Sequence, residues 1–396
     1  MTRREWLKLT TAAGGAALLP NVTGVLGRAG ASAQTAPAAG RERLLADFGW
    51  RFHLGHADDV AKDFGYGRGG AFAKSGSLIG GRGSVTQAAF DDSAWTAVDL
   101  PHDWAIDLPF SEDRNLNGHG AKPLGRAYPD TSIGWYRRTF DIPASDAGRR
   151  IAIEFDGVFR DCLVILNGHY VGRNLSGYVP FRFDITDLVT YGGRNALVVR
   201  VDATEYEGWF YEGAGIYRHV WLEKTAPLHV APWGTFVTSA FNPDGATVTI
   251  ANEIRNDSDT NPVCQVVLTI VDKDGRAVAN YAGSPMPAAA WGNLMFKYQM
   301  KLQHPLLWSV DAPNMYKAIT EVRAGSNVVD TYETPFGIRS VHFDADKGFF
   351  LNGEPVKIKG TCNHQDHAGV GAGLPDRLQY FRIEKLKEMG SNAYRT

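Results

Sequence analysis

The sequence predicts a mostly β protein in which two successive β-sandwiches lead into the first unit of a (β/α)8 barrel. Residues 41–226 and residues 227–337 each hold several short runs of alternating apolar and polar residues separated by turn signals, which is typical of sandwiches. From Gly348 onward the pattern changes to a strand, a polar loop, an amphipathic helix and the start of another strand. That order is typical of parallel β/α architecture.

Length and composition agree with a folded chain of several domains. The 396 residues are 44% hydrophobic and 21% charged, which is too apolar for a disordered protein and leaves room for two or three domains. The 10 Trp, 15 Tyr and 20 Phe residues suit sandwich cores, although aromatic side chains also stack on sugar rings. We therefore expect most of them to pack inside the domains.

The first 33 residues have the three parts of an export signal. Arg3 and Arg4 begin a basic start that resembles the twin-arginine motif, a weak apolar run follows from Leu9 to Leu19, and Ala31-Ser-Ala33 offers a cleavage site. The apolar run is too short to span a bilayer. The sequence therefore predicts a twin-arginine signal peptide over residues 1–33 and a periplasmic or secreted protein without a membrane span.

Charge and cysteine content argue against several partner classes. Residues 1–33 hold four bases and one acid; without them 37 bases and 42 acids remain, with no basic patch, so we expect no nucleic-acid partner. Cys162, Cys264 and Cys362 lie far apart and lack metal-ligand spacing. We expect three buried thiols, no metal and no cofactor.

Residues 41–226 are expected to form the first sandwich. Arg43–His53 begins the ordered part, residues 65–84 read as a Gly-rich loop, and Asn167-Gly168 is the strongest hairpin signal of the region. Further strands are predicted at 134–140, 150–155, 161–168, 169–173, 195–202 and 215–222. Because no convincing helix lies between them, these strands predict a sandwich or jelly roll.

Five short motifs in this region carry a family resemblance. They are, in order, Leu100-Pro-His-Asp-Trp104, Gly134-Trp-Tyr-Arg-Arg-Thr-Phe140, Leu166-Asn-Gly168, Gly177-Tyr-Val-Pro-Phe181 and Gly213-Ala-Gly-Ile-Tyr-Arg218. Together they resemble the sugar-binding domain of glycoside hydrolase family 2, the family of β-galactosidases, β-glucuronidases and β-mannosidases. The resemblance implies a carbohydrate substrate.

Two loops of this domain are candidates for contact with a ligand. In similar β-galactosidases the residue matching Asp103 reaches into the sugar pocket, whereas Asp103 taken alone suits a turn that caps local backbone N–H groups, and both interpretations stay open. The stretch Glu205–Glu212 places acids among aromatics, but Trp209 stands where some relatives have a substrate-binding Asp. We therefore expect that stretch to pack against the barrel.

Residues 227–337 are expected to form an immunoglobulin-like sandwich that acts as a spacer. A Pro-containing linker, Ala226–Pro232, leads into alternating strands at 246–252, 264–272, 293–300 and 315–322. The segment Leu307–Tyr316 resembles a piece of the corresponding domain in family 2 enzymes. No catalytic cluster appears in this region, and association into a homo-oligomer is left open.

Residues 338–396 are expected to open a catalytic barrel. A short strand at Phe336–Arg339 leaves the second sandwich, and the first barrel strand is predicted over Val356–Cys362. A helix over Asp376–Met389 follows, and Asn392–Arg395 opens the second strand. We expect the chain to stop within the second unit of an incomplete TIM barrel, which leaves the apolar side chains of this part uncovered and the part itself poorly ordered.

The loop Asn363-His-Gln-Asp-His367 follows the first predicted barrel strand, where such barrels build their active sites. It is similar to a loop of family 2 enzymes whose aspartate contacts substrate hydroxyls and whose histidines line the pocket. The resemblance implies substrate-binding roles for His364, Asp366 and His367. A metal pair of the two histidines lacks a third ligand, and a polar loop with satisfied histidines is the other interpretation.

The segment Asn392-Ala-Tyr-Arg-Thr396 resembles the start of a family signature in which the arginine supports the nucleophilic glutamate, which implies that role for Arg395. The catalytic glutamates of the family lie on later barrel strands, and no carboxylate of this chain replaces them. The resemblance implies the N-terminal part of an exported retaining β-galactosidase that is inactive alone. A β-glucuronidase, a β-mannosidase and a non-catalytic carbohydrate-binding protein are the alternatives.

Overall fold

The computed structural model describes residues 40–66, 84–113, 118–208 and 210–396. The predicted signal peptide, most of the Gly-rich loop and Trp209 lie outside these residues. Strands dominate the described part, so the mostly β class is confirmed. Its α-helix, α2 (Asp376–Glu388), is short and has no buried residue, and no helix in the described part has the length and hydrophobicity needed to cross a bilayer.

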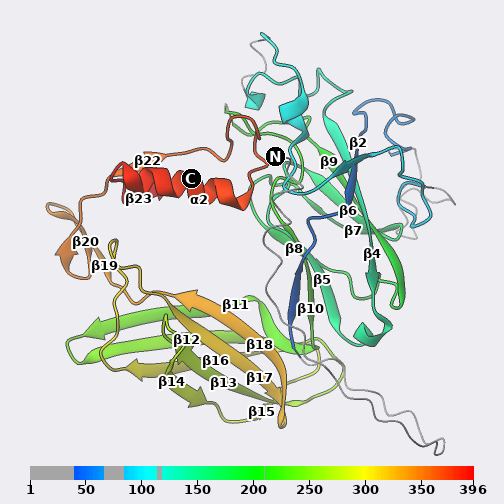
Figure 1. The fold of residues 1–396 in the computed structure, drawn as a ribbon. Coiled ribbons are helices and arrows are strands. Elements are labelled where there is room, and N and C mark those ends of the chain that lie inside the picture. Colours follow the sequence, from blue (N-terminus) through cyan, green and yellow to red (C-terminus); the bar gives the residue numbers. More distant parts are fainter. Residues whose placement is uncertain (1–39, 67–83, 114–117, 209) are drawn as a thin grey trace, which may run out of the picture. The chain divides into compact units, whose positions relative to one another are not determined.

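The first sandwich consists of two antiparallel sheets with strand orders β1-β10-β5-β8 and β3-β2-β4-β9-β6-β7 (Figure 1). Its core lies between the sheets and includes Tyr136, Phe155 and Val199, all fully buried. The strands are β1 (Glu42–Leu45), β2 (Trp50–Leu54), β3 (Thr96–Val98), β4 (Ile133–Ile142), β5 (Arg150–Phe155), β6 (Cys162–Leu166), β7 (His169–Asn174), β8 (Phe181–Asp184), β9 (Gly193–Asp202) and β10 (Val220–Thr225).

Local sequence explains much of this sandwich. The two-residue turn Asn167-Gly168 has φ values of 53° and 83°, as a tight hairpin requires, and Leu166 pairs with His169 across it. The strand predicted at 215–222 is found later, as β10, because Gly213–Arg218 run as a loop whose backbone pairs with Phe159 and His102. The helical segments among the described connections of this sandwich are short 3-10 turns such as Trp104–Asp107.

The second sandwich packs a sheet of order β11-β12-β16 against one of order β14-β13-β17-β18, with β15 beside β13. Burial alternates strictly along β12 and β13, so every second side chain enters the core. The strands are β11 (Leu228–Asn242), β12 (Gly245–Asn256), β13 (Val263–Val271), β14 (Ala277–Ala282), β15 (Met286–Pro287), β16 (Gly292–Leu302), β17 (Tyr316–Ala324) and β18 (Asn327–Phe336).

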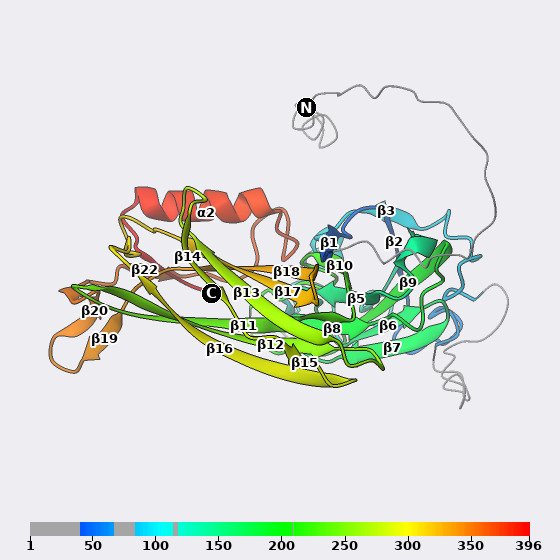
Figure 2. The same cartoon turned by 90° about the horizontal axis from the view of Figure 1, so that it is seen from below.

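Two of the predicted connections are wrong. Most of the expected linker Ala226–Pro232 is already strand, since β11 begins at Leu228, and the ladder with β12 shifts register between Val230 and Thr235 and so accommodates Pro232 in a bulge. The expected strand at Phe336–Arg339 is the last residue of β18 followed by irregular chain. The long strands of the second sandwich can be followed in Figure 2.

The remaining residues form a small antiparallel sheet and then a parallel strand–helix–strand unit. β19 (Val341–Asp344), β20 (Gly348–Leu351) and β21 (Glu354–Pro355) make the first, and β22 (Gly360–Cys362), α2 and β23 (Ala393–Arg395) make the second. The strand predicted over Val356–Cys362 is therefore found only over its last three residues, as β22. The Asn392 amide bonds the backbone of Lys357 and Lys359 in place of a ladder. The described residues contain no closed barrel.

Candidate functional site

The parallel pair β22 and β23 brings two strand ends together. Cys362 and Arg395 are the last residues of the strands and lie opposite one another in the ladder. A hollow of about 500 Å³, here called the strand-end hollow, opens beside them. Its lining residues are Tyr178, Phe210, Arg218, Cys362, Asn363, His364, Gln365, Gln379, Arg382, Tyr394, Arg395 and Thr396.

The first sandwich supplies one wall of this hollow. The ring of Phe210 lies 4.5 Å from the ring of His364, centroid to centroid. The Gln365 side chain donates a 3.0 Å hydrogen bond to the carbonyl oxygen of Tyr211. The stretch 205–212 therefore does contact the loop after β22, as expected from the sequence.

Arg395 is exposed, and its Nη1 lies 3.4 Å from the sulfur of Cys362. Cys362 is exposed too, so the expectation of three buried thiols is wrong for this residue, whereas Cys162 and Cys264 are buried. The reason is that Cys362 ends a short strand with a single neighbour, β23, while Cys162 and Cys264 lie on strands inside the sandwiches. Burial raises the pKa of the Cys162 thiol to about 12.

Arg382 of α2 fixes the loop that follows β22. Its guanidinium donates to the backbone oxygens of His364, at 3.3 Å, and of Asp366. The Asp366 side chain is half-buried and is not among the described residues that line the strand-end hollow. His367 is likewise not among the described residues that line the hollow, and its Nδ1 lies 2.9 Å from the carbonyl oxygen of Ala368.

Asp103 is buried beneath this loop and holds three segments together. Its Oδ1 accepts hydrogen bonds from the backbone N–H groups of Ala105 and Ala214, both at 2.9 Å. Its Oδ2 accepts from the Tyr211 hydroxyl at 2.6 Å and from the Ala372 N–H at 2.8 Å. Burial raises the pKa of Asp103, against the effect of these four donors. Both oxygens are thus engaged within the protein, as the capping interpretation expects, and a role on substrate stays a prediction.

Gly371 illustrates how closely this loop packs. Its φ is +62°, and a Cβ added there would collide with the Asp103 carboxylate and the Tyr211 hydroxyl. Only glycine therefore allows the loop to approach the sandwich this closely.

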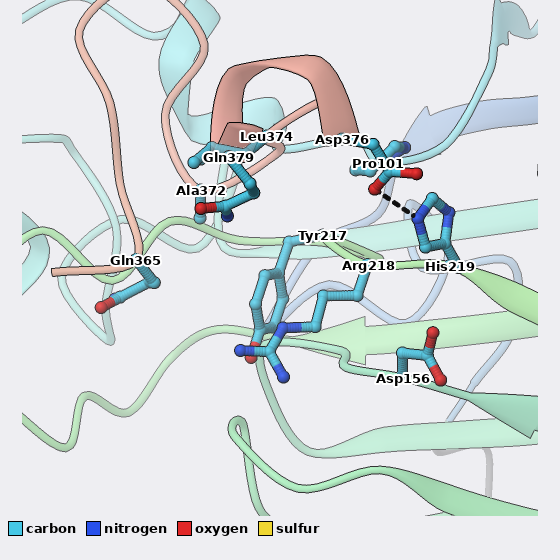
Figure 3. A pocket seen from close by; sticks show the side chains of 10 residues that line it. All are labelled: Pro101, Asp156, Tyr217, Arg218, His219, Gln365, Ala372, Leu374, Asp376 and Gln379. Carbon is cyan, nitrogen blue, oxygen red and sulfur yellow. Dashed lines mark hydrogen bonds and ion pairs between the residues drawn. The ribbon is translucent and has the colours of Figure 1, made fainter. Parts of the chain in front are cut away.

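A second contact joins the start of α2 to the sandwich. His219 Nδ1 lies 2.6 Å from Asp47 Oδ2, and its Nε2 lies 3.0 Å from Asp376 Oδ1. Figure 3 shows the second contact across a smaller hollow of about 230 Å³, which shares Arg218, Gln365 and Gln379 with the strand-end hollow. Because ionised carboxylates only accept, both ring nitrogens donate, and hydrogen bonds to the two aspartates raise the pKa of His219 to about 9.

The stretch 205–212 is itself held from inside by Glu212. This fully buried carboxylate accepts 2.7 Å hydrogen bonds from the N–H groups of Glu207 and Gly208, and a 3.3 Å bond from the Tyr178 hydroxyl. Burial raises its pKa. Glu212 therefore shapes the wall that carries Phe210.

The strand-end hollow is lined mainly by hydrogen-bond donors and aromatic side chains. Its described lining offers three guanidiniums, an imidazole, two phenols and three side-chain amides, but no Asp or Glu side chain. The acids Glu384 and Glu388 lie exposed on α2 and pair with Arg377 and Lys385. Across the part of the chain that the structure describes, no cluster of three or more His, Cys, Asp or Glu side chains has a metal-binding arrangement.

Of the residues singled out from the sequence, the structure brings His364 and Arg395 together at the hollow. It also adds Phe210, Arg218 and Arg382, which sequence reasoning missed as site residues. Arg218 ends the motif Gly213–Arg218, so its motif was visible although its role was not. Phe210 belongs to the candidate stretch Glu205–Glu212, although its own role was not visible, and Arg382 gave no comparable signal, because helical spacing does not show that its guanidinium turns back to the loop after β22.

Comparison with known proteins agrees with this arrangement. The family model "Glycosyl hydrolases family 2, sugar binding domain" matches residues 84–226, and "Glycosyl hydrolases family 2" matches residues 228–339. Beta-galactosidase BoGH2A of Bacteroides ovatus is 38% identical over 369 residues, which cover 92% of this chain and 40% of that protein. A beta-glucuronidase of Formosa agariphila is 31% identical over 330 residues, covering 77% of this chain and 33% of that protein.

Solved structures give the same picture. A glycosyl hydrolase family 2 member from Bacteroides cellulosilyticus superposes with a TM-score of 0.76 at 32% identity, covering 89% of this chain and 42% of that one. A Bacteroides uniformis beta-glucuronidase superposes with a TM-score of 0.74 at 26% identity, covering 90% and 39%. The chain thus spans about two fifths of the length of these structures. By its two sandwiches and these relatives, the chain belongs to glycosyl hydrolase family 2.

Proposed function

We propose that this chain forms the front part of a retaining glycosidase that hydrolyses terminal β-D-galactosides. The observation that carries the proposal is the strand-end hollow, where the ends of two parallel strands meet a wall of the family's sugar-binding domain. Active sites of β/α barrels lie at this end of their strands. The similarity to the Bacteroides ovatus beta-galactosidase supports the choice of sugar.

In this proposal the residues at the hollow bind and orient rather than react. His364 and Asn363 offer donors and acceptors for sugar hydroxyls, and Phe210 offers an apolar face beside them. The Arg395 guanidinium would stabilise an ionised carboxylate nearby, which is the form a glycosidase nucleophile needs. We propose that Asp103, Asp366 and His367 bind substrate after small movements of the loops that carry them.

Retaining hydrolysis requires two carboxyl groups about 5–5.5 Å apart, one as acid and one as nucleophile. No Asp or Glu side chain is among the described residues lining the hollow. We therefore expect the purified chain to show no turnover of an aryl β-galactoside. Clear turnover by residues 1–396 alone, after removal of contaminating host enzyme, would refute this part of the proposal.

The proposed activity can be tested by assaying the longest natural polypeptide that contains this chain on aryl β-glycosides. This polypeptide should hydrolyse an aryl β-galactoside with a kcat/KM at least about tenfold above that for the matching β-glucuronide or β-mannoside. Loss of kcat on Arg395→Ala would support the proposed role of that residue. Failure to cleave any aryl β-glycoside would instead favour a non-catalytic carbohydrate-binding protein.

A β-glucuronidase is the second candidate, and one observation favours it. Arg218, Arg382 and Arg395 place three positive charges at a hollow whose described lining has no Asp or Glu side chain, and such a field suits a uronate substrate. Beta-glucuronidases also occur among the relatives. A kcat/KM that favours the glucuronide and falls steeply with ionic strength would select this candidate.

We also propose that the protein is exported by the twin-arginine route. The support is the sequence of residues 1–33, with Arg3 and Arg4 before a weak apolar run. Fusion of this segment to a reporter that is active only outside the cytoplasm should give signal, and changing both arginines to lysine should abolish it. A signal unaffected by that change would count against the route.

A further inference from the structure

A third hollow lies where strands β5 and β8 of the first sandwich meet β11 and β12 of the second. Its volume is about 240 Å³, and it is here called the junction hollow. It shares no lining residue with the strand-end hollow. Its lining residues are Arg150, Ala152, Arg182, Asp184, His229, Pro232, Trp233, Arg255 and Asp257.

One exposed tryptophan lines the junction hollow, and a second lies beside one of its lining arginines. Trp233 lines it from the bulge of β11 and is 60% exposed, with a φ of +52°. Trp291 is 65% exposed with a φ of +53°, and the guanidinium of Arg150 lies 5.8 Å from the centre of its ring. A bulky residue with positive φ is uncommon and costs free energy, so two such indoles beside one hollow call for a reason other than folding.

The polar lining of the junction hollow offers both donors and acceptors. Arg150 bonds Asp184 through Nη2 at 2.6 Å, and Arg255 bonds Asp257 through Nη2 at 2.9 Å. A guanidinium has five N–H groups and a carboxylate has about four acceptor positions, so each pair keeps unused capacity on both sides. The third cation, Arg182, is balanced by Glu223 at 2.7 Å.

This balance of charge indicates the kind of ligand. A phosphate or a carboxylate would meet carboxylates as well as guanidiniums, whereas a neutral polyol can donate to the former and accept from the latter. A flat apolar ring face beside alternating donors and acceptors complements a pyranose, which has an apolar C–H face and a rim of hydroxyl groups. The two features therefore point to the same ligand class.

We propose that the junction hollow is a non-catalytic binding site for a neutral hexose unit of a β-linked oligosaccharide. The sugar ring stacks on the indole of Trp233, and its hydroxyls bond the Arg150–Asp184 and Arg255–Asp257 pairs. A longer glycan extends past Arg150 toward Trp291. The site would hold polymeric substrate near the enzyme, but its existence does not depend on the proposed activity.

The full chain can be titrated with β-1,4-galactotetraose by calorimetry, with cellotetraose and sodium sulfate as comparison ligands. Trp233→Ala should weaken binding of whichever tetraose binds more tightly to the parent chain. The expected loss of affinity is about tenfold, the size of effect that loss of one aromatic stacking contact gives. Phe236→Ala is the matched control, because Phe236 lies on the same strand, is 69% exposed and does not line the hollow; its affinity should stay within about twofold of the parent.

Two further variants separate this site from the strand-end hollow. Trp291→Ala should weaken binding of the tetraose but not of methyl β-galactoside, and the tetraose binding that Trp233→Ala removes should persist in Arg395→Ala. Binding that is lost with Arg395→Ala and kept with Trp233→Ala would overturn the inference while supporting the proposed active site. Saturable binding of sulfate alone, or of no oligosaccharide at millimolar concentration, would overturn it as well. Thermal unfolding of each variant verifies that it is folded.

Discussion

The first sandwich and the strand–helix–strand unit β22-α2-β23 differ in how they bury apolar side chains. The sandwich encloses Tyr136 and Phe155 completely, whereas α2 has no buried residue, and its Phe381 and Ile383 are each 42% exposed. The unit is attached through the loop before α2, by hydrogen bonds of the Asp103 carboxylate and the Gln365 amide and by packing of Ala372 against Phe159 and Tyr217, and through the His219–Asp376 ion pair. The comparison teaches that the sandwiches stabilise themselves, while the unit that shapes the strand-end hollow depends on its neighbours.

Removing a buried ring should separate the two regions most strongly. Phe155 is fully buried and stacks on Phe181 at 4.9 Å, so Phe155→Ala should lower the free energy of unfolding by about 3–5 kcal/mol. Phe381→Ala on α2 is the matched control and should change it by less than about 1 kcal/mol. Urea unfolding followed by fluorescence measures both, and equal losses would break the comparison.

Asp103→Asn should give the next largest effect, because an amide cannot accept on both sides as the carboxylate does. With a donor facing the Tyr211 hydroxyl or the Ala372 N–H, we expect a loss of about 1–3 kcal/mol in the free energy of unfolding. Proteolysis near residues 368–374 should also become faster. Asp99→Asn changes an exposed carboxylate that accepts one backbone bond, and it should leave both readouts nearly unchanged.

The His219 contact should make the attachment of α2 depend on pH. The pKa of His219 is raised in the folded protein, so its contribution is fully present below the ordinary histidine pKa of about 6.5 and is lost as pH rises through about 9. Amide exchange in α2, corrected for the intrinsic pH dependence, should therefore accelerate between these values. His219→Gln should remove that transition, and a transition that persists in the variant must have another origin.

Arg395→Ala should have the smallest effect on folding. The side chain is exposed, and its contact with the sulfur of Cys362 is long, so the free energy of unfolding should change by less than about 0.5 kcal/mol. A loss above about 1.5 kcal/mol in urea unfolding would show that Arg395 is structural, which would weaken its proposed place in the active site.

Sequence reasoning predicted the strands well where the pattern is local. The strand 150–155 appears with the same bounds, and the turn Asn167-Gly168 lies where its two-residue signal predicts it. It failed at Pro232, which indicated a linker because proline cannot donate to a strand ladder, but which lies within β11 at a bulge. It also missed β8, a short strand whose two phenylalanines are only half-buried.

The candidate site was predicted less completely, for a physical reason. His364 and Arg395 follow strand ends, so their sequence positions place them near one another in a parallel pair. Phe210 and Arg218 reach the hollow only because the first sandwich lies against the loop after β22, a contact between residues more than 140 positions apart. Packing between distant segments leaves no local signal in one sequence.

Hydrogen exchange across the whole chain tests the central difference most directly. Backbone amides of α2 and β23 should exchange much faster than those of β5 and β9 in the first sandwich, because the helix buries no side chain and β23 has one neighbour. Protection of residues 376–395 equal to that of the sandwich strands would contradict the account. It would show that the strand–helix–strand unit is as stable as the sandwiches although the side chains of α2 are not buried.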